Sequence, residues 1–270
     1  MICNITIDML VDAIEIHWKL QLGSYFSGVH KLNGAVYNIG GRVTDYYWNY
    51  AGLINAEHGK EKDLIAEIIA FAESKNRIPA IYLDPSTKPN NFDVFLKEAG
   101  FIAEDDEIWM FYDRNKQTDI VNPKEMKILP VKNMKDMEGF ISVFNEAYEM
   151  LEEGETESPY GQSLLDAFQN PPKEVIIEHY LGVVNKKIVT VGSIYMSGDV
   201  AGLYNVGTLP EECKKGYGGA ISSYVINRSN ELDHRRLLLQ TELDSDAASL
   251  YSKLGFMPAF SGAIWSLAGE

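Results

Sequence analysis

A glycine-rich turn in the second half of the sequence combines residues that could hold an anion. It follows a strand-like run over 200–208 and leads directly into a helix-patterned segment. The first amides of a helix have no partner within it, and glycines let a ligand approach the backbone closely. Two lysines add positive charge beside these amides. The pattern predicts a pyrophosphate site, with an ordinary surface turn as the alternative. The residues of this turn are Cys213, Lys214, Lys215, Gly216, Tyr217, Gly218 and Gly219.

A second stretch, 237–256, carries a tyrosine near the end of a short helix. A buried-looking strand is followed by an Asp/Ser cap and by an amphipathic helix over 246–254, which Gly255 closes. Tyr251 lies one helical turn before Gly255. Judged by pattern alone, Tyr251 fills the inner face of this helix. Asp244 is best interpreted as the N-cap of the helix.

Together the two stretches resemble the acyl-CoA-binding core of the GNAT acyltransferase superfamily. The superfamily pattern R/Q-x-x-G-x-G/A falls on Cys213-Lys214-Lys215-Gly216-Tyr217-Gly218. A second pattern, N-x-x-A-x-x-L-Y-x-x-x-G-F, falls on Asp244, Ala247, Leu250, Tyr251, Gly255 and Phe256. Two departures stand out, because Cys213 replaces Arg or Gln and Asp244 replaces Asn. The loss of a side-chain donor at Cys213 predicts weaker phosphate binding, with the backbone donors kept.

The resemblance implies a role for each matched residue in transfer from acetyl-CoA. Tyr251 is expected to be the general acid that protonates the departing thiolate. Val206 and Thr208 are expected to offer backbone groups to the pantetheine arm, with the Val206 amide as the oxyanion donor. Asp244 would then lie near the cofactor arm as a consequence of its position. Cys213 is interpreted as a substituted residue of the phosphate loop and not as a nucleophile, although two lysines follow it.

The general base stays open at this point. Glu242, near the end of the fifth strand of the second half, is the first candidate. Tyr204, Glu178 and His179 on neighbouring strands are alternatives, and a chain of water molecules could do the same work.

Periodicity predicts the elements that must hold these residues. The second half has the order β-α-α-β-β-β-α-β-α-β, which is the order of the superfamily's mixed, twisted sheet with helices on both faces. Its expected segments are 126–131, 134–150, 162–168, 175–184, 188–196 and 200–208, followed by the two stretches above. In the first half we expect a helix over 5–16, strands over 18–44, a helix over 60–74, a strand over 80–83, a helix over 92–99 and a strand over 107–112.

A short internal repeat suggests that the chain holds two copies of one fold. Phe95 to Phe101, followed by Ile108-Trp109, parallels Leu250 to Phe256, followed by Ile264-Trp265. Leu96 stands where Tyr251 stands, and the first half has no counterpart of the glycine-rich turn. We therefore expect an α/β protein of two tandem GNAT-like domains. Residues 1–118 form a degenerate first domain, and residues 119–270 form the domain that binds acetyl-CoA.

Composition restricts the classes of partner. The chain has 270 residues and a formal net charge of −15, which opposes nucleic acid and anionic membranes and mildly favours amines. Its two cysteines form neither a disulfide framework nor a metal-ligand cluster, so no metal is expected. Neither a signal peptide nor a membrane span is recognised, which favours the cytoplasm.

The most specific function consistent with these features is acetyl transfer to a small amine, performed by a monomer. The first half would wall the acceptor cleft and replace the partner subunit that single-copy relatives often recruit. A non-catalytic acyl-CoA-binding or sensor protein is the alternative, favoured by Cys213 and by the unidentified base. Aminoacyl transfer from tRNA is opposed by the negative charge.

Overall fold

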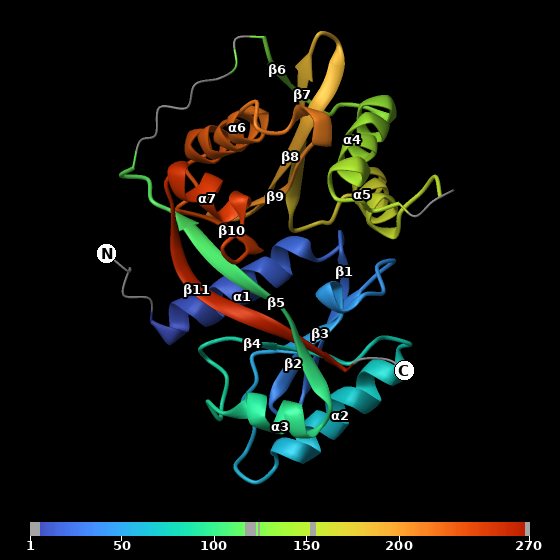
Figure 1. Cartoon of the computed structure of the whole chain (residues 1–270), viewed down its shortest axis with the longest axis vertical. Helices are drawn as coiled ribbons and strands as arrows, with labels where there is room; N and C mark the ends of the chain where they lie inside the picture. The colour runs from blue at the N-terminus through green and yellow to red at the C-terminus, as the bar shows by residue number, and fades with distance from the viewer. Residues whose placement is uncertain (1–5, 117–122, 124, 152–154, 268–270) are drawn as a thin grey trace.

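The computed structural model describes residues 6–116, 123, 125–151 and 155–267. Within them the strands form one 11-stranded sheet in the order β1-β2-β3-β4-β11-β5-β10-β9-β8-β7-β6 (Figure 1). The helices are α1 (Ile7–Gln21), α2 (Glu61–Ser74), α3 (Phe92–Glu98), α4 (Met134–Ala147), α5 (Pro159–Gln169), α6 (Tyr217–Glu231) and α7 (Asp246–Lys253). The strands are β1 (Phe26–Leu32), β2 (Ala35–Gly40), β3 (Tyr50–Gly52), β4 (Ala80–Leu83), β5 (Phe101–Tyr112), β6 (Lys127–Pro130), β7 (Ile176–Val184), β8 (Lys187–Ser197), β9 (Val200–Thr208), β10 (Arg236–Glu242) and β11 (Phe256–Leu267).

The last strands of the two halves are exchanged. β11 lies between β4 and β5, and β5 lies between β11 and β10. β5 and β11 pair antiparallel from Phe101 opposite Leu267 to Tyr112 opposite Phe256. Figure 1 shows these two long strands running side by side through the middle of the molecule. The sheet is therefore continuous across both halves.

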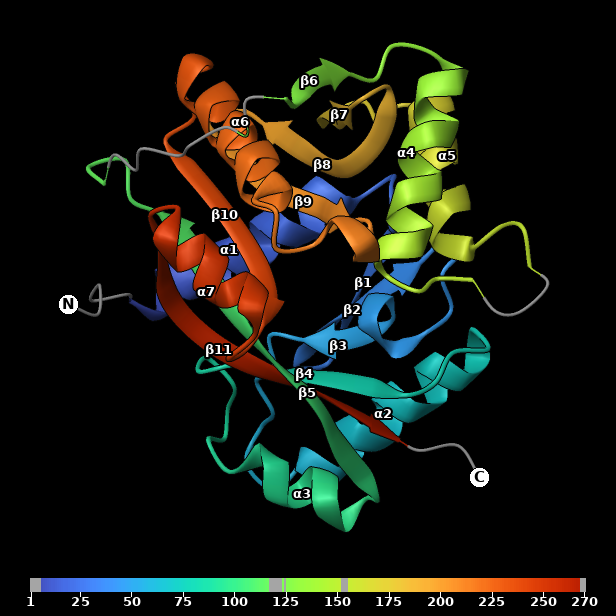
Figure 2. The same cartoon turned by 45° about the horizontal axis from the view of Figure 1, so that its top comes forward.

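Helices cover both faces of this sheet and divide the core into several clusters. In the second half, α6 and α7 pack on one face, and α4 and α5 lie on the other (Figure 2). α1 packs across the strands at the centre of the sheet, where Trp18 and Trp109 belong to one buried cluster. α2 and α3 cover the first half.

The first helix corrects the sequence-based prediction. A helix over 5–16 followed by strands from Trp18 was expected, but α1 continues through Trp18 to Gln21. The Thr6 side chain accepts the Met9 amide, which caps the start of the helix. Leu10, Ile14 and Trp18 recur at helical spacing and are all buried, so the apolar face continues past residue 16.

The second half follows the predicted order of elements. Its strands and helices appear where periodicity placed them, and Asn185-Lys186 forms the hairpin turn between β7 and β8 with positive φ at both residues. The predicted fold class, a mixed α/β sheet, is confirmed. The predicted boundary between residues 118 and 119 lies outside the described residues. Among the described residues, no helix is both long and apolar enough to span a membrane.

Candidate functional site

The strands β9 and β10 separate partway along their length. They pair in parallel only at Val200 with Arg236, Ala201 with Leu237, and Gly202 with Leu238. Beyond that point β10 continues to pair with β5, from Leu238 to Glu242, while β9 continues along β8. The C-terminal parts of β9 and β10 are therefore not paired with each other, and a gap separates the two strands.

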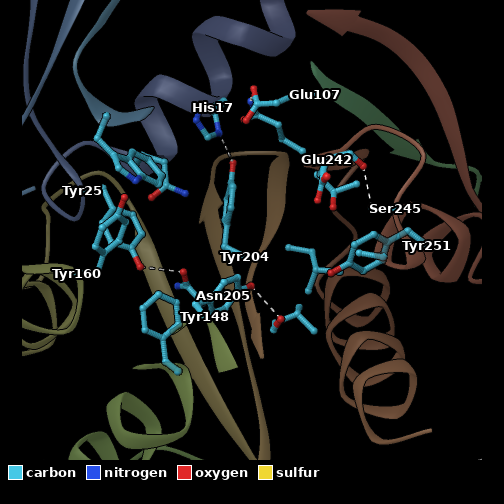
Figure 3. A pocket seen from close by; sticks show the side chains of 18 of the residues that line it. His17, Tyr25, Glu107, Tyr148, Tyr160, Tyr204, Asn205, Glu242, Ser245 and Tyr251 are labelled. Atoms are coloured by element: carbon cyan, nitrogen blue, oxygen red, sulfur yellow. Dashed lines mark hydrogen bonds between the residues drawn. The ribbon is translucent and has the colours of Figure 1, made fainter. Parts of the chain in front are cut away.

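A pocket of about 460 Å³ occupies this space. Both strands line it, and so do α1, α4, α7 and the segment around Trp48 (Figure 3). Each half of the chain therefore contributes to its wall. The lining residues are His17, Gln21, Tyr25, Trp48, Glu107, Phe144, Tyr148, Met150, Tyr160, Leu203, Tyr204, Asn205, Val206, Gln240, Thr241, Glu242, Ser245, Ala247 and Tyr251.

Tyr251 enters the pocket from α7. Figure 3 shows its phenol directed from the helix toward the pocket centre. Its side chain is also part of a core cluster and meets Phe256 edge-on, with ring centroids 5.9 Å apart. Burial, with a smaller contribution from Tyr148, raises the pKa of Tyr251 above its ordinary range. The phenol is therefore protonated at neutral pH and can donate a proton.

A bulge in β9 opens the backbone at the pocket. The pairing of β8 with β9 skips Asn205 and Val206, and Asn205 has a left-handed φ of 54°. A bulge leaves its extra residue outside the regular ladder. The Val206 carbonyl accepts the Tyr148 hydroxyl at 2.9 Å, which joins α4 to β9. Val206 thus lies outside the regular ladder, and it lines the same pocket as Tyr251.

Tyr204, one of the suggested bases, is bound to α1 of the first half. Its hydroxyl lies 3.0 Å from His17 Nδ1. Burial raises the pKa of Tyr204 and lowers the pKa of His17 to about 3, so both groups are neutral near pH 7. The Gln21 amide lies close enough to oppose part of the rise in the Tyr204 pKa, although neither of its polar atoms reaches hydrogen-bond geometry. A phenol with a raised pKa is a poor base.

Two carboxylates line the pocket. Glu242 on β10 lies directly opposite Glu107 on β5 in the antiparallel ladder, so both side chains share one face. Gln240 donates a hydrogen bond to Glu107. Glu242 is exposed, which leaves it accessible to solvent and substrate.

The other suggested bases lie elsewhere. Glu178 forms a two-pronged ion pair with Arg228, at 2.8 and 2.9 Å, which holds the pKa of Glu178 below its usual range. His179 is buried, and its Nδ1 lies 2.7 Å from Ser193 Oγ. Both line a second pocket, and neither lines the one that Tyr251 enters.

The glycine-rich turn has the geometry of an anion cradle. Lys214 and Gly216 have left-handed φ values of 62° and 86°, and Gly216 is the N-cap of α6. Throughout the described part of the chain, no group accepts a hydrogen bond from the amides of residues 214–219. A Cβ at Gly218 would lie 3.3 Å from Thr208 Oγ1, so a side chain there would crowd the end of β9. These open amides are the property that phosphate binding needs.

This turn lies next to the pocket and outside its lining. Thr208, two residues after Val206, ends β9, and its carbonyl accepts the Cys213 thiol at 3.7 Å. Cys213 is exposed, and the Lys215 ammonium pairs with Glu212 at 2.8 Å. Val206, which lines the pocket, and Thr208, which contacts the turn, thus lie two residues apart on β9.

Asp244 does not cap the helix as predicted. The N-cap is Ser245, whose Oγ accepts the Ala248 amide at 3.1 Å. Asp244 has a left-handed φ of 58° and is exposed, so it forms the turn that precedes the cap. Ser245 lines the pocket, whereas Asp244 does not.

Sequence reasoning missed the residues that the first half contributes. His17, Gln21, Tyr25, Trp48 and Glu107 all line the pocket. Tyr25 donates to Asn205 Oδ1 at 3.0 Å across a separation of 180 positions, and its ring lies 4.3 Å from that of Trp48. No local pattern signals such contacts; the internal repeat, which includes β5, was the one available hint. No group of three or more His, Cys, Asp or Glu residues suited to a metal ion occurs within the described ranges.

Comparisons with known proteins agree with this geometry. Residues 180–265 match the family described as FR47-like protein. A GCN5-related N-acetyltransferase from Kribbella flavida is 15% identical, with a TM-score of 0.72 over 99% of this chain and 98% of that one. A GCN5-related N-acetyltransferase from Sphaerobacter thermophilus is 12% identical, with a TM-score of 0.68 over 96% and 86%.

A protein that consists of tandem GNAT units is also similar. It is a tandem GNAT protein from the clavulanic acid biosynthesis pathway, 11% identical, with a TM-score of 0.60 over 87% of this chain and 80% of that one. No curated protein matches the sequence. The chain therefore has the GNAT N-acetyltransferase fold along nearly its whole length, and part of its C-terminal half resembles the FR47-like family.

Proposed function

We propose that the protein is an N-acetyltransferase that moves the acetyl group of acetyl-CoA directly to a small amine, with Tyr251 as general acid. One observation carries the proposal. A buried, protonated phenol, the open backbone of β9 and a carboxylate line a single pocket between two diverging strands. Direct acyl transfer needs these three kinds of group, and it needs no covalent enzyme intermediate.

The residues along β9 fit acetyl-CoA. The open amides of residues 214–219 would bind its pyrophosphate, with Lys214 adding charge beside them. The pantetheine arm would follow β9 from Thr208 to Val206 in the manner of an added strand. Cys213 supplies no charged side chain to this cradle, so the backbone carries the binding.

Acetyl-CoA supplies an acyl thioester, and the side chains of the pocket handle the protons. A neutral amine attacks the thioester carbonyl, so a C–N bond forms and the C–S bond breaks. The Val206 amide donates to the carbonyl oxygen as negative charge develops on it. Tyr251 gives its proton to the departing sulfur. Glu242 takes the proton that the amine loses, directly or through water.

The replacement Tyr251→Phe tests this assignment. The variant keeps the ring that packs on Phe256 and removes only the proton donor. We expect turnover on a panel of amines to fall roughly 100-fold or more, the range for loss of a general acid, while the Kd for acetyl-CoA stays unchanged. Turnover equal to wild type would remove Tyr251 from the mechanism.

An acyl-CoA-binding protein without catalysis is the second candidate. The observation in its favour is Cys213, which stands exposed in the phosphate turn without a charged donor. In that case wild-type protein would bind acetyl-CoA and acetylate no amine in the panel. We also propose that the protein acts as a monomer, because each half already receives its last strand neighbour from the other half of the same chain.

A further inference from the structure

The bulge in β9 is anchored from the first half of the chain. Tyr25, which lies between α1 and β1, donates its hydroxyl to Asn205 Oδ1 at 3.0 Å (Figure 3). The Tyr25 side chain is buried, and its ring lies 4.3 Å from that of Trp48, so packing restricts where the hydroxyl can lie. A residue of the first half therefore contacts the strand segment that the proposed transfer uses.

The side-chain amide of Asn205 has partners on both of its polar atoms. Besides accepting from Tyr25, it donates through Nδ2 to Ser193 Oγ and to the Tyr195 hydroxyl, each at 3.3 Å. The Tyr195 hydroxyl also lies 3.0 Å from the hydroxyl of Ser24, which precedes Tyr25. Ser193 and Tyr195 are fully buried. A buried network of this kind holds one arrangement, because breaking any of its bonds leaves a polar group without a partner.

The backbone of Asn205 has a conformation that needs such support. Its left-handed φ of 54° is unfavourable for most residues, although asparagine adopts it more readily than most. The peptide plane that follows carries the Val206 amide. On the other side of that amide, the Tyr148 hydroxyl holds the Val206 carbonyl at 2.9 Å. The Val206 amide thus lies between two groups that are each fixed by a side-chain hydrogen bond, and loss of either bond would let its direction change.

We propose that Tyr25 and Asn205 are positioning residues that set the direction of the Val206 amide. The inference rests on the proposed acetyl transfer, in which that amide donates to the developing oxyanion. Tyr25 acts through Asn205 and not through contact with the acceptor. The first half therefore contributes to the reaction by holding the bulge of β9, in addition to lining the pocket.

Two single replacements and their combination test this coupling. Tyr25→Phe keeps the ring on Trp48 and removes the donor, and Asn205→Gly removes the acceptor while glycine tolerates the left-handed backbone. Each should lower kcat about tenfold, because a misdirected oxyanion donor loses part of the roughly 100- to 1000-fold that a missing donor costs. The double variant should lose no more than Asn205→Gly alone. Losses that multiply to about 100-fold would overturn the inference, since Tyr25 would then act without Asn205.

The choice of amine separates positioning from contact with the acceptor. Pentylamine, benzylamine, spermidine and lysine are offered as acceptors, and those that wild type acetylates are compared. Tyr25→Phe should lower kcat by the same factor for each of them and leave the KM for the amine unchanged. A loss confined to one amine, or a raised KM with kcat kept, would assign Tyr25 to the acceptor site and overturn the inference.

A matched control separates loss of position from loss of stability. Tyr37→Phe also removes a buried hydroxyl of the first half, which donates to the Asn49 carbonyl at 3.2 Å, and Tyr37 does not line the pocket. This variant should keep the wild-type kcat. An equal fall in kcat for Tyr37→Phe and Tyr25→Phe would show a general effect of lost hydrogen bonds and would overturn the inference.

Hydrogen–deuterium exchange tests the anchor without any acceptor. Exchange of the backbone amides around Val206 should become about tenfold faster in Tyr25→Phe, because the segment opens more often, and stay at the wild-type rate in Tyr37→Phe. Equal exchange in the two variants would overturn the anchor. Wild type that acetylates none of the four amines would instead count against the proposed function, and the exchange experiment keeps these two failures apart.

Discussion

The two halves of the molecule end in the same way and differ in what surrounds that ending. α3, Gly100 and β5 close the first half, and α7, Gly255 and β11 close the second. Both glycines are left-handed, with φ of 88° and 95°. The strand order is mirrored as well, because β1 to β4 and β7 to β10 flank the central β11–β5 pair. The two halves therefore share one arrangement of elements, and they can be compared to see what distinguishes the half that carries the phosphate turn and Tyr251.

The first difference between the halves lies on α3 and α7, the helices that precede the last strand of each half. In the sequence repeat, Leu96 of α3 stands where Tyr251 of α7 stands. Leu96 is fully buried in the core of the first half, whereas Tyr251 lines the pocket. The same helical position therefore fills the core in the first half and lines the pocket in the second.

A second difference lies in the loop before the crossover helix. Before α2, the amides of Asn55, Ala56, Gly59 and Lys60 all donate to protein acceptors. Before α6, the amides of residues 214–216 donate to no described group. The loop of the first half is tied to the protein by these hydrogen bonds, whereas the amides of residues 214–216 in the second half are open.

The largest effect on stability is expected from Leu96→Ala. Removing a fully buried leucine side chain should lower the free energy of unfolding by about 2–5 kcal/mol, measured by urea denaturation. Because Leu96 does not line the pocket, kcat per folded molecule should stay unchanged. A variant of normal stability with a reduced kcat would contradict the purely structural role of Leu96 and would give the first half a catalytic role.

Acid should destabilise both halves through one buried histidine each. Burial lowers the pKa of His17 and of His179 to about 3, against about 6.5 in an unfolded chain. The unfolded state therefore binds more protons below pH 6.5, and stability falls as the pH drops from there toward 3. Each histidine should cost about 2 kcal/mol at pH 5 relative to pH 7.

Urea unfolding of His17→Gln and His179→Gln at both pH values measures these two costs. Each replacement should remove its own share of the acid sensitivity. If the halves unfold as one unit, both replacements affect the same transition. Two separate transitions, each sensitive to one histidine, would show that the halves are thermodynamically independent.

The smallest expected effect compares two left-handed glycines. Gly216 precedes α6 with φ of 86°, and Gly59 lies just before α2 with φ of 80°. Alanine at either position should cost about 1 kcal/mol of strain. Only Gly216→Ala should also weaken acetyl-CoA binding, by about tenfold, because only Gly216 lies in the loop that is proposed to bind the pyrophosphate. Calorimetric titration of both variants measures this, and an equal loss of affinity in the two would remove the difference between the loops.

Local pattern was sufficient for much of the second half. Its strands alternate or run apolar between clear turn residues, and the glycine turn that predicted a phosphate site is the N-cap of α6 in the structure. Tyr251, Val206 and Glu242, selected from the sequence, line one pocket. The cap was wrongly assigned because Asp244 and Ser245 are both good capping residues, and only backbone geometry distinguishes them.

The remainder depends on contacts that no local pattern encodes. α1 was predicted too short because the aromatic and glycine residues after Ile16 are typical of strands, while packing against the central strands extends the helix through Trp18. The contributions of His17 and Glu107 follow from the exchange of β5 and β11, which joins segments far apart in sequence. Such pairing is set by the tertiary fold and not by propensity.

The long β5–β11 ladder helps to fix the relative positions of residues in the site. It fixes β5 from Phe101 opposite Leu267 to Tyr112 opposite Phe256, and the adjoining ladder then sets Glu107 against Glu242. A slip of two residues would keep every side chain on its own face and yet carry one glutamate about 7 Å along the strand from the other. The distance between Glu107 and Glu242 in the pocket thus depends on strand pairing that extends well beyond the pocket.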